Sequence, residues 1–191
     1  MTCIILSGGA GTRMGGREKA FLTLDGETFI ERKLRLLKPL FSEILIVVNT
    51  PVLYEGLDAV ILQDEIQGSG PLMGMYSGLK HSSSDKNFIT SVDSPYVHTG
   101  LIHYLLESPG DWDAHVPVWR GFLEPLYAVY RKTCVPHIEK VLDRKKVIIF
   151  YDAVRMQYAG EEVIKSFDPQ GNCFININSM EDYTRLTGDN K

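Results

Sequence analysis

Residues 7–19 of the chain, SGGAGTRMGGREK, follow directly on the apolar run Thr2–Leu6. The apolar run is typical of a buried strand and is too short to cross a membrane. The five glycines of residues 7–19 disfavour a helix and allow successive backbone N–H groups to converge on an anion. Arg13, Arg17 and Lys19 bring three positive charges to the same loop. The segment therefore predicts a phosphate-binding loop directly after the first strand.

Two common phosphate-binding patterns do not fit this loop. The Walker pattern requires Lys and then Ser or Thr after its last glycine, whereas Arg17 and Glu18 follow Gly16. A Rossmann dinucleotide fingerprint starting at Gly9 would require glycine in place of Met14. The spacing GGxGxRMGGxxK instead resembles the loop of nucleotidyltransferases that activate a phosphorylated substrate with a nucleoside triphosphate. The alternative is a glycine-rich turn whose arginines are only solvated.

The composition is that of an ordinary globular protein, with 44% hydrophobic and 23% charged residues among 191. We expect a single domain over residues 1–191. The net charge of −4 argues against a broad nucleic-acid surface, so any anion site must be local. The three cysteines form no C-x-x-C pair, which favours reduced, buried thiols and a cytoplasmic location. We expect no signal peptide and no membrane segment.

In the first half of the chain, short apolar runs alternate with helical patterns. Strands are predicted at residues 44–48, 60–62 and 88–92, and a helix is expected to open at residues 68–71. Such alternation predicts an α/β fold, a doubly wound and mostly parallel sheet of the Rossmann-like type. In these sheets, ligands bind at the carboxyl ends of the strands. The loop at 7–19, Asn49, Asp64 and Asp93 all follow predicted strands, and we expect them to share one edge.

One further helix is predicted from Thr28, with Glu31 completing a capping box and Pro39 marking the end. Its apolar face consists of Ile30, Leu34 and Leu37. Lys33 and the other cations of this segment are expected to lie mostly off that face.

The second half has a different pattern. Strands are predicted at Ala114–Trp119 and Leu126–Tyr130 around a turn at Gly121, as a hairpin or an antiparallel edge. The apolar run Val147–Phe150 predicts another strand, and the alternation in Phe174–Asn178 predicts a half-exposed strand. No linker divides the two halves.

Four segments together resemble the molybdenum cofactor guanylyltransferases of the MobA type: LSGGAGTRMGGREK at 6–19, SGPLMGMYSGL at 69–79, VDSPYV at 92–97 and FININSMEDY at 174–183. The resemblance spans nearly the whole chain. It implies a Rossmann-like fold that transfers GMP from GTP to the phosphate of molybdopterin, releasing pyrophosphate, with Mg²⁺ as cofactor. It also implies transient contact with molybdoenzymes or their chaperones.

The resemblance further implies roles for individual residues. Leu6, Ser7 and Gly8 match the opening nucleotide contacts, and the pair Gly8-Gly9 is similar to the guanylyl-transferring branch. Lys19 matches a phosphate-binding lysine. The remaining matches on the nucleotide side are Asp64, the metal-binding aspartate Asp93, and Asn49, which lies two residues beyond the usual asparagine position. The pair Glu124-Pro125 stands where some members have His-Pro, on the molybdopterin side.

Physical chemistry supports these roles independently. Nucleotidyl transfer depends mainly on positioning and on neutralising phosphate charge. Arg13 and Lys19 would offset the charge on the departing pyrophosphate, and Asp93 would hold Mg²⁺, which needs only one or two carboxylates besides phosphates. The alternative for Asp93 is a turn or helix cap, and for Asp64 a solvated loop acid. Asn176 and Asn178 would either hydrogen-bond the second substrate or be solvated.

Other functions remain open at this point. One is a related nucleotidyltransferase that uses CTP or a sugar phosphate, which nucleotide preference would separate from a guanylyltransferase. Another is a non-catalytic nucleotide-binding module that keeps the loop without turnover. The presence of Asp93 argues against that module, because a binder has less need of a metal at the reacting phosphate.

Overall fold

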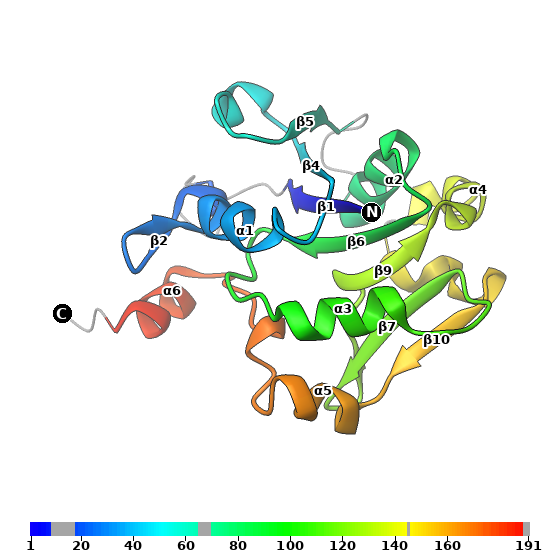
Figure 1. Ribbon diagram of the computed structural model, residues 1–191. Coiled ribbons are helices and arrows are strands. Elements are labelled where there is room, and N and C mark those ends of the chain that lie inside the picture. The colour runs from blue at the N-terminus through cyan, green and yellow to red at the C-terminus, as the bar shows by residue number, and fades with distance from the viewer. Residues whose placement is uncertain (9–17, 65–69, 145, 189–191) are drawn as a thin grey trace.

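A computed structural model describes residues 1–8, 18–64, 70–144 and 146–188 (Figure 1). Its centre is an eight-stranded sheet of order β10-β7-β9-β6-β1-β4-β5, with β8 paired to β7. The strands are β1 Thr2–Ser7, β4 Glu43–Val48, β5 Val60–Gln63, β6 Lys86–Ser91, β7 Ala114–Trp119, β8 Phe122–Leu123, β9 Tyr127–Arg131 and β10 Met156–Ala159. A separate two-stranded sheet joins β2 Thr23–Leu24 to β3 Glu27–Thr28.

The large sheet is mostly parallel, as predicted. Strand β1 pairs in parallel with both β4 and β6, β4 with β5, and β7 with β10. Strand β9 runs antiparallel between β6 and β7. The prediction of a strand at 126–130 is therefore confirmed, but β9 lies inside the sheet and not at its edge. The glycine-rich residues 9–17 lie outside the described residues.

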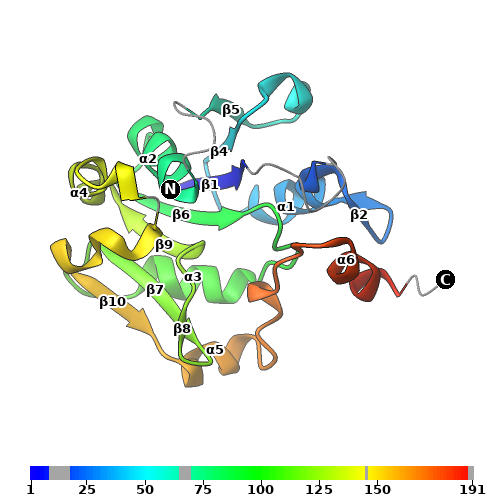
Figure 2. The ribbon, with the colours of Figure 1, turned by 180° about the vertical axis from the view of Figure 1, so that it is seen from behind.

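Helices cover both faces of the sheet (Figures 1 and 2). Helices α1 Phe29–Leu37, α3 Thr99–Glu107 and α5 Glu161–Phe167 contribute buried residues to one core cluster. Helices α2 Pro71–His81 and α4 Val135–Glu139, with the 3-10 helix η6 Val147–Ala153, contribute to the cluster on the other face. The remaining 3-10 helices are η2 Lys19–Phe21, η3 Pro51–Tyr54, η4 Lys132–Cys134, η5 Leu142–Arg144 and η7 Asn172–Phe174. Within the described residues, no helix is both long and apolar enough to span a bilayer.

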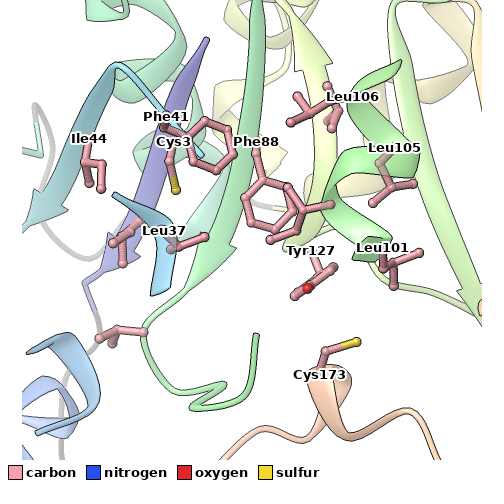
Figure 3. Packing of buried hydrophobic residues seen from close by; sticks show 14 of the residues in the cluster. Cys3, Leu37, Phe41, Ile44, Phe88, Leu101, Leu105, Leu106, Tyr127 and Cys173 are labelled. Atoms are coloured by element: carbon pink, nitrogen blue, oxygen red, sulfur yellow. The ribbon is translucent and has the colours of Figure 1, made fainter. Parts of the chain in front are cut away.

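Strand β1 supplies side chains to both clusters because successive residues of a strand point to opposite faces. Cys3 and Ile5 pack in one cluster, and Ile4 and Leu6 pack in the other. In the first cluster, residues from strands and from α1 and α3 converge around Phe88 (Figure 3). The three cysteines are free and buried, as predicted.

The C-terminal helix α6, Met180–Thr187, lies beside the β2–β3 hairpin (Figures 1 and 2). A small third cluster consists of Leu22, Leu24, Phe29 and Ile177, with Tyr183 packed against it. Capping boxes begin both α6 and α1: Ser179 with Asp182, and Thr28 with Glu31. The predicted capping box of α1 is confirmed.

Two predicted strands are wrong. Val147–Phe150 belongs to the 3-10 helix η6, where Val147, Phe150 and Tyr151 are buried at helical spacing. A four-residue apolar run does not distinguish a strand from a short helical turn. Phe174 is the last residue of η7, and residues 175–178 lie outside the sheet. The N–H of Ile177 donates to the carbonyl of Asp93 at 2.8 Å and not to a residue of a strand.

The glycines of α2 set how closely this helix approaches the sheet. A Cβ at Gly78 would lie 2.5 Å from Cγ2 of Ile4, whereas one at Gly74 would lie 3.2 Å from Cδ2 of Leu6. We expect Gly78→Ala to lower the free energy of unfolding by about 1–2 kcal/mol, since overpacking outweighs the gain in helix propensity. Gly74→Ala is the matched control and should lower it by less. Urea unfolding of both variants measures the difference, and equal effects would contradict the tight contact at Ile4.

Candidate functional site

The ammonium group of Lys19 joins three parts of the chain at the carboxyl edge of the sheet. Its Nζ lies 3.2 Å from Oδ2 of Asp93 and donates a hydrogen bond of 2.9 Å to Oδ1 of Asn178. Lys19 begins η2, Asp93 follows β6, and Asn178 precedes α6. The side chains of Lys19 and Asp93 are 22% and 19% exposed, so both remain open to a ligand from solvent. Three residues predicted from the sequence therefore meet in space.

Neighbouring residues hold the Asp93 carboxylate and backbone in place. The hydroxyl of Ser91 donates to Oδ1 of Asp93, on the opposite side from Lys19. The carbonyl of Asp93 accepts from the N–H of Ile177, which fixes residues 175–178 beside it. The N–H of Asn178 in turn donates to Oδ2 of Asp182 at 3.0 Å, the same carboxylate that caps α6. The geometry of Asp93 thus depends on both β6 and the C-terminal segment.

Leu6 and Ser7 end β1 with their side chains directed into the protein. Leu6 is 7% exposed and Ser7 is 5% exposed. The hydroxyls of Ser7 and Tyr54 are hydrogen-bonded at 2.7 Å, and burial raises the pKa of Tyr54 to about 12. Gly8, the next residue, is exposed. A ligand at this end of β1 would therefore contact backbone atoms and not these two side chains.

Asn49 and Asp64 follow β4 and β5 on the same edge. A Cβ at Gly8 would lie 3.5 Å from Oδ1 of Asn49, so the ends of β1 and β4 are adjacent through this side chain. The N–H of Asp64 donates to the carbonyl of Val48 at 2.9 Å, and its Oδ1 accepts a hydrogen bond of 3.3 Å from Ser77 of α2. Both residues are half-buried. The structure places them at neighbouring strand ends, as the sequence predicted.

One further predicted residue, Asn176, does not join this arrangement. Asn176 is exposed, and the described contacts of Lys19 involve Asn178 instead. Gly9 and Arg13 lie outside the described residues.

The described residues include no cluster of three or more His, Cys, Asp or Glu that could hold a metal alone. Mg²⁺ usually binds proteins through one or two carboxylates and completes its shell with water and substrate phosphates. Asp93 offers a partly exposed carboxylate at a strand end, with a cation beside it to receive phosphate oxygens. The residues present therefore fit a magnesium ion that binds together with a phosphorylated substrate.

Lys33 of α1 is a residue whose position the sequence pattern misassigned. It is fully buried, and its Nζ donates to Oγ1 of Thr90 in β6 at 2.9 Å. Burial lowers its pKa to about 8, opposed by the negative charge of the nearby Asp93 carboxylate. Residues 30, 33, 34 and 37 share the buried face of α1. The i, i+3, i+4, i+7 spacing of these four residues is typical of the buried face of a helix, so the sequence did contain a signal for the burial of Lys33.

Known proteins resemble the chain over its full length. The family profile described as "MobA-like NTP transferase domain" matches residues 3–158. The protein named "Probable molybdenum cofactor guanylyltransferase" from Methanosarcina mazei is 34% identical, with 100% of this chain and 91% of that protein covered. The "Molybdenum cofactor guanylyltransferase" of Desulfosudis oleivorans is 35% identical, with 95% and 92% covered. The crystal structure of "Molybdopterin-guanine dinucleotide biosynthesis protein A" from Archaeoglobus fulgidus superposes with a TM-score of 0.86 at 25% identity, covering 98% and 97%.

We expect Lys33→Met to raise the free energy of unfolding at pH 7 by roughly 1–3 kcal/mol, because it removes a buried ammonium at the expense of one hydrogen bond to Thr90. The folded-state pKa of about 8 lies below that of the unfolded chain. The unfolded wild type therefore binds more protons between about pH 8 and 10.4, and its stability rises with pH across this window.

The gain in the free energy of unfolding of Lys33→Met over the wild type should accordingly be largest below pH 8 and decrease toward pH 10.4. Urea unfolding at these two pH values measures it, with the exposed Lys165→Met as control. A difference that grows with pH would contradict the buried charge.

Proposed function

The chain belongs to the MobA-like NTP transferase family, and on that premise we propose that it transfers GMP from GTP to the phosphate of molybdopterin. The products are molybdopterin guanine dinucleotide and pyrophosphate. The names of the full-length relatives support this assignment. The observation that carries it in the structure is the convergence of Lys19, Asp93 and Asn178 at the carboxyl edge of the sheet.

In this proposal, Lys19 stabilises the transition state electrostatically. Two polyanions must approach each other, and a positioned cation lowers their repulsion as charge moves to the leaving pyrophosphate. Arg13 would add a second cation of the same loop. Asp93 would hold Mg²⁺, which when bound offsets charge on phosphate oxygens. Ser91 keeps the Asp93 carboxylate oriented for this role.

The nucleotide is proposed to lie along the ends of β1, β4 and β5. Asn49 and Asp64 offer hydrogen-bonding groups there, and Gly8 leaves room for close approach of a ligand to the backbone. Leu6, Ser7 and Gly9 would contribute backbone groups. Asn176 and Asn178 are proposed to contact the molybdopterin side, next to Lys19.

Residues 1–191 are proposed to act as one nucleotidyltransferase domain. The large sheet supports this, because β10 of the second half pairs with β7 while β6 and β9 join the halves. The three buried free cysteines are compatible with the reducing cytoplasm, where we expect the reaction to take place. Molybdoenzymes or their chaperones are the proposed recipients of the product.

We expect Asp93→Asn and Lys19→Met each to lower kcat/KM for pyrophosphate release from GTP and molybdopterin by about a hundredfold or more. Asp58→Asn and Lys165→Met are matched controls, since both remove exposed, ion-paired charges of residues that do not belong to this cluster. Their kcat/KM should stay close to that of the wild type.

Three results would contradict the proposal in different ways. Retained activity in Asp93→Asn would exclude its metal-binding role. Faster turnover with CTP than with GTP would assign a cytidylyltransferase. Tight nucleotide binding without pyrophosphate release from any acceptor would assign a binding module.

A further inference from the structure

A hollow lies beside the β7–β8 hairpin. It is an open pocket of about 670 Å³. Its lining includes residues from the hairpin region and from the end of η7 with the residue that follows: Trp119, Arg120, Phe122, Glu124, Phe174 and Ile175. The Glu124-Pro125 pair stands where some similar proteins have His-Pro, and the proposed nucleotide-binding arrangement does not use Glu124.

The apolar walls of this pocket are fixed by close packing. Gly171 has a φ of +69°, and a Cβ there would lie 2.3 Å from the indole of Trp119, so only glycine fits. The rings of Trp119 and Phe174 lie 6.0 Å apart. At the rim, Phe122 is 74% exposed and Ile175 is 41% exposed. Large apolar side chains that face outward around a pocket favour a flat, hydrophobic ring as its ligand.

Glu124 is the acidic residue among the described residues that line this pocket. Its backbone is held by hydrogen bonds to Pro117 at 2.9 Å and from Tyr127 at 3.1 Å. Its carboxyl makes no hydrogen bond or ion pair with any described residue, and the nearby Arg120 guanidinium instead lies 5.5 Å above the Trp119 ring. Burial raises the pKa of Glu124 to about 7. A half-buried carboxylate of this kind is stabilised by a ligand with two adjacent N–H donors in one plane.

The register of the sheet places Glu124 and Asp93 at the ends of adjacent strands. Thr90 of β6 pairs with Tyr127 of the antiparallel β9. Asp93 follows Thr90 by three residues and Glu124 precedes Tyr127 by three, so both leave the sheet at the same edge from neighbouring strands. Glu124 and its pocket lie on the β9 and β7 side of Asp93, opposite the proposed nucleotide side at β1, β4 and β5.

The C-terminal segment runs from the pocket to Lys19. Phe174 and Ile175 line the pocket, Ile177 hydrogen-bonds Asp93, and Asn178 accepts from Lys19. Asn178 follows Phe174 by four positions, a length of chain that spans at most about 14 Å. A ligand with its ring in the pocket and its phosphate at Lys19 would therefore be the size of a small phosphorylated heterocycle.

We propose that the pocket at Glu124 holds the pterin ring of the phosphate acceptor, with the Glu124 carboxylate accepting from the ring N3–H and the 2-amino group. This rests on the proposed function, because it takes molybdopterin as the acceptor. Guanine presents an equivalent pair of donors, N1–H and its 2-amino group. The position of the pocket beyond Asp93, away from Gly8, Asn49 and Asp64, favours the pterin.

The test is equilibrium binding of 6-carboxypterin, measured by calorimetry on the full-length protein. The matched ligand is 6-carboxylumazine, which has an oxo group in place of the 2-amino group. We expect the wild type to bind 6-carboxypterin at least about tenfold more tightly than 6-carboxylumazine, since a site built for a donor rejects the analogue without it. Glu124→Gln should weaken 6-carboxypterin binding at least about tenfold, while Glu124→Asp keeps part of it.

Glu162→Gln is the matched control, because Glu162 is 91% exposed on α5 and should leave binding unchanged. Circular dichroism establishes that each variant is folded. The Kd for Mg-GTP should be the same in Glu124→Gln as in the wild type.

Equal 6-carboxypterin binding by Glu124→Gln and the wild type, or no saturable binding up to about 1 mM, would overturn the proposal. A Glu124→Gln variant that loses Mg-GTP and keeps 6-carboxypterin would assign the pocket to guanine. Because this binding requires no turnover, its failure is separable from that of guanylyl transfer. If the protein binds 6-carboxypterin through Glu124 but has no activity, only the proposed transfer reaction is refuted. If the enzyme is active and Glu124→Gln changes neither binding nor activity, only the proposed pterin pocket is refuted.

Discussion

The site depends on the position of one ammonium group, that of Lys19. It lies between a carboxylate 74 residues away and an amide 159 residues away in the sequence. These contacts connect the glycine-rich end of β1 to β6 and to the C-terminal segment. The small cluster around Leu22, Leu24, Phe29 and Ile177 packs the same segments together. Charge pairing and apolar packing therefore stabilise the same arrangement of three distant pieces of chain.

The direction of the strands explains why the polar residues share one edge. In β1, β4, β5 and β6 the chain leaves the sheet at the same end, so Gly8, Asn49, Asp64 and Asp93 become neighbours. The reversed strand β9 enters the sheet at that end and brings Glu124 there. We propose that this sheet edge has a nucleotide side and an acceptor side, with Lys19 and Asp93 between them. A transfer reaction between two phosphorylated molecules requires such an arrangement.

The sequence predicted this edge well because its strands are continuous apolar runs with polar residues directly after them. It failed where local pattern and tertiary context disagree. Lys33 carries a charge at an apolar position of α1, and only the full i, i+3, i+4, i+7 spacing indicates its burial. Phe174–Asn178 alternates like a strand, yet its backbone bonds to Asp93. The contact between Lys19 and Asn178 could not be predicted from the sequence, because no local pattern indicates which residues meet when 159 positions separate them.

The most direct test of the account is thermal unfolding of the purified protein with GTP, CTP, ATP or UTP, each with and without Mg²⁺. A nucleotide at a hundredfold its Kd adds roughly 2.7 kcal/mol to the free energy of unfolding, which is readily visible as a shift in Tm. We expect the largest shift in Tm with Mg-GTP and the loss of this shift in Asp93→Ala. The absence of a shift with every nucleotide would contradict the central claim that this sheet edge binds a nucleoside triphosphate.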